Sequence, residues 1–147
     1  MSTFHNYDPL KVTVSFDGVD IQGFADGAFV EVEREVDTWS KHVGATGDIT
    51  RVRSRDRSGK IKIILMAASS SNDQMMALFL ADELSGTGTG SFMLKDLSGN
   101  MRCNAKDCWI KKPPKVERGK DAGNVEWELE CGDLTIVAGG NVNDTAP

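Results

Sequence analysis

The sequence is short of the side chains that most catalytic and metal sites require. It contains only two histidines, His5 and His42, and its three cysteines include no C-x-x-C pair. Serines are frequent, yet neither G-x-S-x-G nor S-x-x-K occurs, and the glycine-rich residues 86–90 lack the lysine of a phosphate loop. We therefore expect a protein that is not an enzyme and that has no cofactor and no metal.

Long apolar runs are also missing. The longest, residues 61–68 and 75–81, are far too short to cross a bilayer. Residues 1–8 contain no apolar segment of the kind that marks a signal peptide. The sequence thus predicts a protein without membrane contact that is made in a cytoplasm. A formal net charge of −5 argues against general attraction to nucleic acid, although a local basic strip remains possible.

The three cysteines are too few and too irregular for a disulfide framework. Cys131 alternates in phase with Trp127 and Leu129, so we interpret it as a small buried hydrophobic residue. Cys103 and Cys108 could meet across a short hairpin. We interpret all three thiols as structural.

A chain of 147 residues with 15 glycines suits a single β-rich domain over residues 1–147. We expect an N-terminal arm at residues 1–9 and a C-terminal tail at residues 139–147. Alternating apolar residues predict strands at residues 10–16, 19–22, 29–36, 91–95, 101–105, 107–112, 116–120, 124–131 and 134–138.

The most regular pattern is a ladder of arginines at alternate positions, followed by the apolar run at residues 60–66. The arginines are Arg51, Arg53, Arg55 and Arg57. Since side chains alternate between the faces of a strand, an extended ribbon would carry all of them on one edge. We interpret residues 49–66 as a long β-hairpin with its tip near residues 55–59, preceded by a loop at residues 38–48.

One helix is expected, at residues 71–84. Ser71 and Gln74 have the spacing of a capping box, and Ser85-Gly86 gives a stop signal. The residues expected to face the sheet are Met76, Phe79, Leu80 and Leu84. The predicted fold class is mainly β (α+β), with two packed antiparallel sheets forming a sandwich or barrel, one flanking helix, a long hairpin and extended terminal arms.

The arginine ladder has three possible roles. It is a solvated strand edge that blocks unwanted pairing, a DNA-binding strip, or a contact with acidic residues of a neighbouring subunit. DNA binding is the weakest of these because no aromatic residues are interleaved for base stacking.

Acidic residues also alternate, in two separate segments. They are Glu31, Glu33 and Glu35, and Glu126, Glu128 and Glu130. Carboxylates in a row on a strand do not converge on a cation. They form either a solvated face or part of a continuous negative surface in an assembly of copies.

The order of several segments resembles the tail tube proteins of contractile-tailed bacteriophages, in the small branch of about this length. The segments are Tyr7-Asp8-Pro9 and residues 19–27, 29–34, 47–54, 71–73, 80–83, 95–99, 109–114 and 126–141. The resemblance implies two packed sheets with one helix, a fold shared with the type VI secretion tube. It also implies six-fold rings that stack into a hollow tube through which the genome passes.

From the resemblance we expect a virion tail component, assembled in the host cytoplasm, with sheath, baseplate and tail terminator proteins as partners and DNA only as passing cargo. The glutamates would face the lumen. Candidate contacts between subunits and rings are Phe4, Tyr7, Trp39, His42 and the four arginines of the ladder. The alternatives are a tube of a phage-derived bacteriocin or secretion apparatus, and a monomeric β-sandwich that binds a ligand or nucleic acid.

Overall fold

The computed structural model describes residues 7–121 and 123–139, and within these ranges the chain forms two antiparallel sheets and one α-helix. The mainly β fold class is confirmed. The strands are β1 (Val12–Phe16), β2 (Val19–Asp20), β3 (Val30–Arg34), β4 (Trp39–Val43), β5 (Ile49–Arg53), β6 (Gly59–Met66), β7 (Gly90–Asp96), β8 (Arg102–Ile110) and β9 (Asn124–Val137). A short 3-10 helix, η1 (Pro9–Lys11), precedes β1, and the helix α1 (Ser71–Ser85) follows β6.

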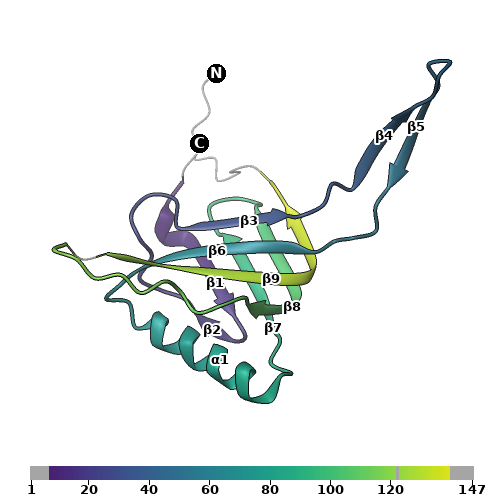
Figure 1. Cartoon of the computed structure of the whole chain (residues 1–147). Helices are drawn as coiled ribbons and strands as arrows, with labels where there is room; N and C mark the ends of the chain where they lie inside the picture. Colours follow the sequence, from purple (N-terminus) through teal and green to yellow (C-terminus); the bar gives the residue numbers. More distant parts are fainter. Residues whose placement is uncertain (1–6, 122, 140–147) are drawn as a thin grey trace, which may run out of the picture.

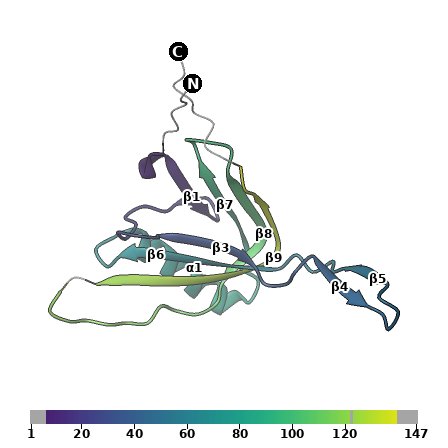
Figure 2. The same cartoon turned by 90° about the horizontal axis from the view of Figure 1, so that it is seen from above.

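Seven strands form one sheet in the order β2-β1-β7-β8-β9-β6-β3 (Figure 1). The first part of β9 pairs with β6, and its last part pairs with β8. Because β9 curves between these partners, the sheet folds into two inclined halves, which Figure 2 shows from above. The sheet has edges at β2 and β3, so it does not close into a barrel.

The core lies between the two halves of the sheet. Alternate residues of β6 and β9 point into it, including Ile63, Leu65, Trp127 and Leu129, and all four are almost fully buried. Met75 of α1 closes one side of this core. Burial of each large side chain contributes about 1.5–3 kcal/mol, so these alternating positions set the strand register.

The helix is confirmed with nearly the predicted bounds, and Gly86 ends it in a left-handed conformation. Its predicted start is wrong in detail, because Ser70 is the N-cap and Ser71 is buried inside the first turn. The Ser71 hydroxyl instead accepts a hydrogen bond from the backbone of Gln22 at 2.9 Å. The predicted apolar stripe is also partly wrong, since Leu80 and Leu84 are exposed while Met75 is the buried residue.

The predicted hairpin at residues 49–66 is wrong, and so is the predicted loop at residues 38–48. The arginine-bearing strand β5 pairs with β4, and the tip of this hairpin lies between Val43 and Ile49. β6 pairs instead with β3 and β9 in the large sheet. The β4–β5 hairpin therefore forms a small sheet of its own, which projects away from the body of the protein (Figure 1).

The C-terminal half has fewer and longer strands than predicted. The strands predicted at residues 101–105 and 107–112 are replaced by a single strand, β8, which ends at Ile110 and in which Asp107, with φ of 53°, shifts the alternation of buried residues. Those predicted at residues 124–131 and 134–138 are likewise replaced by one strand, β9, which ends at Val137. The predicted strand at residues 116–120 does not form. Residues 1–6 of the predicted arm, and 140–147 of the tail, lie outside the described residues.

The curve of β9 predicts a strict requirement for glycine at position 59. A Cβ on Gly59 would lie 2.3 Å from Cδ2 of Leu134 and 2.9 Å from the carbonyl oxygen of Glu33. Gly59→Ala should lower the free energy of unfolding by about 1–3 kcal/mol because the core is overpacked. Urea denaturation measures this change.

Gly132→Ala is the matched control, because a Cβ on Gly132 meets no heavy atom within 4 Å. Its free energy of unfolding should stay within about 0.5 kcal/mol of the unmodified protein. Equal stability of the two variants would contradict the packing described for this corner.

Candidate functional site

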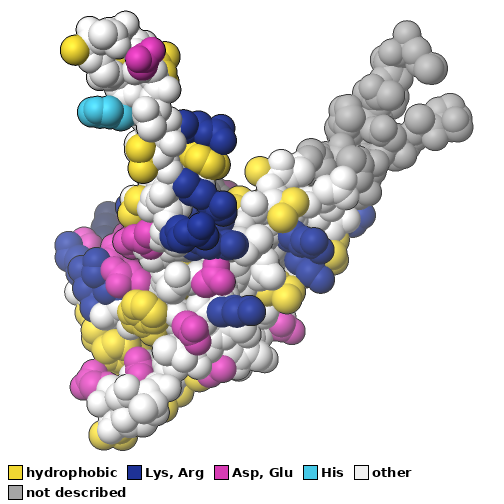
Figure 3. Space-filling view, turned by 90° about the vertical axis from the view of Figure 1, so that its right-hand side faces the viewer, with side chains coloured by type: hydrophobic (Ala, Val, Ile, Leu, Met, Phe, Trp, Pro, Cys, Tyr) yellow, Lys and Arg dark blue, Asp and Glu magenta, His cyan; other side chains and the backbone are white. Residues whose placement is uncertain are grey.

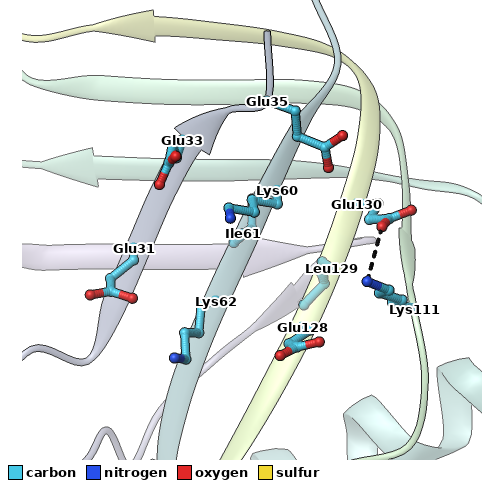
Figure 4. Close-up of a pocket in the computed structure, with 10 residues that line it drawn as sticks. All are labelled: Glu31, Glu33, Glu35, Lys60, Ile61, Lys62, Lys111, Glu128, Leu129 and Glu130. Atoms are coloured by element: carbon cyan, nitrogen blue, oxygen red, sulfur yellow. Dashed lines mark ion pairs between the residues drawn. The ribbon is translucent and has the colours of Figure 1, made fainter.

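The exposed side of β3, β6 and β9 carries a dense array of charges, which we call the charged face. It consists of Glu31, Glu33, Glu35, Lys60, Lys62, Lys111, Lys112, Glu126, Glu128 and Glu130. Figure 4 shows most of these side chains above the three strands, with a dashed line between Lys111 and Glu130. Both predicted rows of glutamates thus lie on one surface.

The two acidic rows do not touch, because β6 runs between them and supplies lysines. The cross-strand triplets are Glu31–Lys62–Glu128 and Glu33–Lys60–Glu130. Opposite charges directly across a sheet stabilise the pairing, whereas like charges would repel. Lys60 and Lys62 therefore separate the two predicted acidic rows, and the charged face as a whole carries six glutamates and four lysines.

Several of these charges form ion pairs. Lys62 pairs with Glu126, the Nζ of Lys111 lies 3.5 Å from Oε1 of Glu130, and the Nζ of Lys112 lies 4.0 Å from Glu128. All are at least one-third exposed, so each contributes about 0–1 kcal/mol. Within residues 7–121 and 123–139, no cluster of three or more His, Cys, Asp or Glu side chains could hold a metal ion.

The projecting hairpin is the second candidate surface. Directly paired residues share a face, so Trp39, Lys41, Val43, Ile49, Arg51 and Arg53 lie on one side, which we call the cationic face. The guanidinium carbon of Arg51 lies 3.6 Å from the centre of the Trp39 ring, and that of Arg53 lies 5.9 Å away. This stacking fixes the arginines against an exposed aromatic ring. His42 is exposed on the opposite side of the hairpin from Trp39.

The arginine ladder is divided between two places. Arg57 belongs to the base of the hairpin, where its Nε lies 3.0 Å from Oδ1 of Asp133 and its Nη2 donates to Thr135 at 2.9 Å. Arg34 holds the other side of the base by donating to the carbonyl oxygen of Leu134. Figure 3 shows basic side chains gathered at this base and hydrophobic ones along the hairpin.

The remaining predicted contact residues are less informative. Arg55 follows β5 and is exposed, and Tyr7 is exposed ahead of η1. Phe4 lies outside the described residues. Sequence reasoning missed Lys60, Lys62 and Arg34, although Lys60 and Lys62 alternate with the buried isoleucines of β6.

The cysteines do not form a reactive site. Cys103, Cys108 and Cys131 are buried, and Cys108 lies directly opposite Cys131 across β8 and β9. Burial raises the pKa of each thiol, and the adjacent Cys131 helps to raise the pKa of Cys108 to about 12. These thiols therefore stay protonated at neutral pH, as expected of structural cysteines.

The sequence matches a known family over almost all of the described chain. Residues 10–139 match the family described as Bacteriophage PhiTE tail tube protein. The chain belongs to this family. It is a structural subunit of a phage tail tube, and hence a component of the virion. Structural protein ORF10 of Pseudomonas phage KPP10 is 28% identical over 143 residues, covering 92% of this chain and 83% of that protein.

Solved structures of injection systems share the fold of this tail tube subunit. The tube-terminating cap of the anti-feeding prophage matches with a TM-score of 0.65 at 10% identity, over 93% of this chain and 94% of that one. A chain of the sheath–tube complex of an extracellular contractile injection system matches with a TM-score of 0.61 at 11% identity, over 90% of this chain and 92% of that one. Across the described part of the tail tube subunit, no helix has the length and apolar character needed to span a membrane.

The charged face predicts a weak, salt-dependent coupling across the sheet. In a double-mutant cycle, Lys62→Met and Glu126→Gln should show a coupling energy of about 0.2–1 kcal/mol that shrinks in high salt. The cycle of Lys115→Met with Glu117→Gln is the control, because that pair is far more exposed. Urea denaturation measures both, and a larger coupling for the control would contradict a stabilising role for the Lys62–Glu126 ion pair.

Because the thiols are buried, we expect them to be unreactive in the folded protein at both neutral and mildly alkaline pH. Between pH 7 and 9 the cysteines should not react with a disulfide reagent such as Ellman's, because burial keeps their pKa values above the ordinary 9.0. All three cysteines of the chain should react once it is unfolded in guanidinium. Rapid labelling of the native protein would contradict the burial described.

Proposed function

We propose that the tail tube subunit associates with copies of itself into rings of six, which stack into a hollow tube that conducts DNA during ejection. The match of residues 10–139 to a tail tube family is the observation that carries this proposal. The projecting β4–β5 hairpin supports it from the geometry. A two-stranded hairpin is marginally stable alone, and this one exposes Trp39, Val43, Ile49 and Val52.

The open edges of the large sheet fit association into rings. β3 presents an unpaired edge of five residues at one end of the strand order, and β2 ends the other side. Exposed edges invite uncontrolled pairing unless something covers them. Contacts between unlike surfaces of neighbouring copies cover such edges and close into a ring when the rotation permits.

In this assembly the charged face lines the lumen, and the arginines of the hairpin take part in contacts between subunits. Six glutamates against four lysines leave the charged face acidic, which repels DNA weakly. A lumen lined by the arginine ladder would instead retain DNA, since bound arginines release the counterions of the phosphates. We therefore assign Arg51 and Arg53, with Trp39, to contacts between copies.

The proposed partners are sheath, baseplate and tail terminator proteins, with assembly in the host cytoplasm. The likeness to a chain of a sheath–tube complex and to a sheath/tube terminator supports the first and the last of these. The tube subunit acts as a structural protein and not as an enzyme. The fold likeness to injection systems also favours a second candidate, a tube of a phage-derived bacteriocin or secretion apparatus that carries no DNA.

Size-exclusion chromatography with negative-stain microscopy tests self-association directly. Concentrated protein should form rings or tubes. A stable 16.0 kDa monomer at high concentration would instead indicate a monomeric binding module. DNA affinity that falls steeply with salt would favour nucleic-acid binding by such a monomer.

Reversing one charge on the cationic face should impair assembly and leave the fold intact. Arg53→Glu places a carboxylate beside Trp39, where the contact requires a cation. We expect a large drop in the sedimentable fraction at low salt, with an unchanged circular dichroism spectrum. Lys115→Glu is the control, because Lys115 is highly exposed and remote from the hairpin in sequence. Polymerisation of Arg53→Glu at the level of this control would rule out the contact.

A further inference from the structure

A preformed apolar groove lies beside β1, on the side away from β7. Its floor and walls come from η1, β1 and the segment of residues 20–29, and its volume is about 610 Å³. Its apolar lining includes Val12, Val14, Ile21, Phe24 and Phe29. The groove is therefore wide enough for several side chains.

Backbone hydrogen bonds hold the outer wall of the groove in place. The N–H of Ala25 donates to Ile64 at 3.0 Å, and the N–H of Ile64 donates to Phe29 at 2.9 Å. The rings of Phe24 and Phe29 pack with their centres 4.7 Å apart. Because this wall is tied to a central strand, the groove does not depend on a ligand for its shape.

The cationic face of the hairpin lacks counter-charges of its own. Lys41 and Arg51 lie directly opposite each other, an arrangement that is destabilising between like charges. No ion pair in residues 7–121 and 123–139 involves Lys41, Arg51 or Arg53. Val43 and Ile49 extend the same face as an exposed apolar tip. The hairpin thus needs a partner with an apolar surface and carboxylates.

We propose that the groove receives the cationic face of the hairpin of a second copy. The apolar tip fits the apolar floor, and Asp20 in the groove wall supplies a carboxylate for an arginine. β2 pairs with Ser15 and Phe16, and the N–H of Ile21 continues this pairing by donating to the carbonyl oxygen of Val14 at 2.9 Å, so the groove contact relies on side chains and not on an added strand.

Hairpin and groove lie at opposite ends of β3. The groove residue Phe29 immediately precedes β3, and the chain leaves the other end of β3 for the hairpin. In Figure 1 the hairpin projects to the right, beyond the end of β3. One copy therefore cannot fill its own groove, and the contact is heterologous. This inference rests on the proposed self-assembly and assigns its receiving surface.

Crosslinking between two variants tests the contact. Ile49→Cys, at the hairpin tip, is mixed with Leu10→Cys at the groove rim, allowed to assemble, and treated with a short bismaleimide. Ile49 is 67% exposed and Leu10 is 91% exposed, so neither change disturbs the core. A covalent dimer is expected from the mixture and not from either variant alone. The unmodified protein should give none, because its cysteines are buried.

Ile49→Cys mixed with Leu84→Cys is the matched control, since Leu84 is also 91% exposed but lies on α1. If the protein assembles but Leu10→Cys gives no crosslinked dimer with Ile49→Cys, the groove is not the receiving surface. The same holds if Leu84→Cys gives as much dimer as Leu10→Cys. Either result leaves the proposed tail tube function intact. Failure of the unmodified protein to assemble contradicts the proposed function itself.

Two further results decide the occupant. If Leu10→Cys resists a monofunctional maleimide in unassembled protein, the groove already holds the N-terminal residues of its own chain, and the proposal is wrong. If Leu10→Glu abolishes assembly while Leu84→Glu does not, the groove is the receiving surface even where cysteine variants assemble poorly. Equal assembly of these two glutamate variants overturns the proposal.

Discussion

The alternation of buried and exposed residues along β6 and β9 is the constraint on which the structure depends. One row of side chains on each strand fills the core around Trp127, and the other row must then face outward together. β9 serves both halves of the sheet because it curves where Gly59 lets Leu134 approach. The same packing that builds the core therefore also brings Lys60 and Lys62 between two rows of glutamates.

Local patterns in the sequence predicted most of the strands and the helix. Which strands pair with each other was harder to predict. The period of two identified β1 and β6, and helical spacing with Gly86 identified α1. The hairpin was misplaced because β4 is exposed on both faces, so its sequence carries no alternation to detect. The single shift at Asp107 divided one long strand into two apparent ones.

The candidate site could be predicted only in part for a related reason. Each acidic row was visible within its own strand, but the lysines that separate the rows come from a strand paired through long-range contacts. The arginine ladder was visible too, yet its division between a hairpin face and an anchored base depends on where β5 ends. The charged side chains of this family member lie on extended strand surfaces, which fits a structural subunit.

The placement of the hairpin and the groove at the two ends of β3 has a further consequence. Any stack built from that contact has direction: one terminus offers free hairpins, and the other offers empty grooves. A protein that stops growth at one end of the stack then cannot bind the other end, so starting and stopping assembly of the tube require two differently shaped partners.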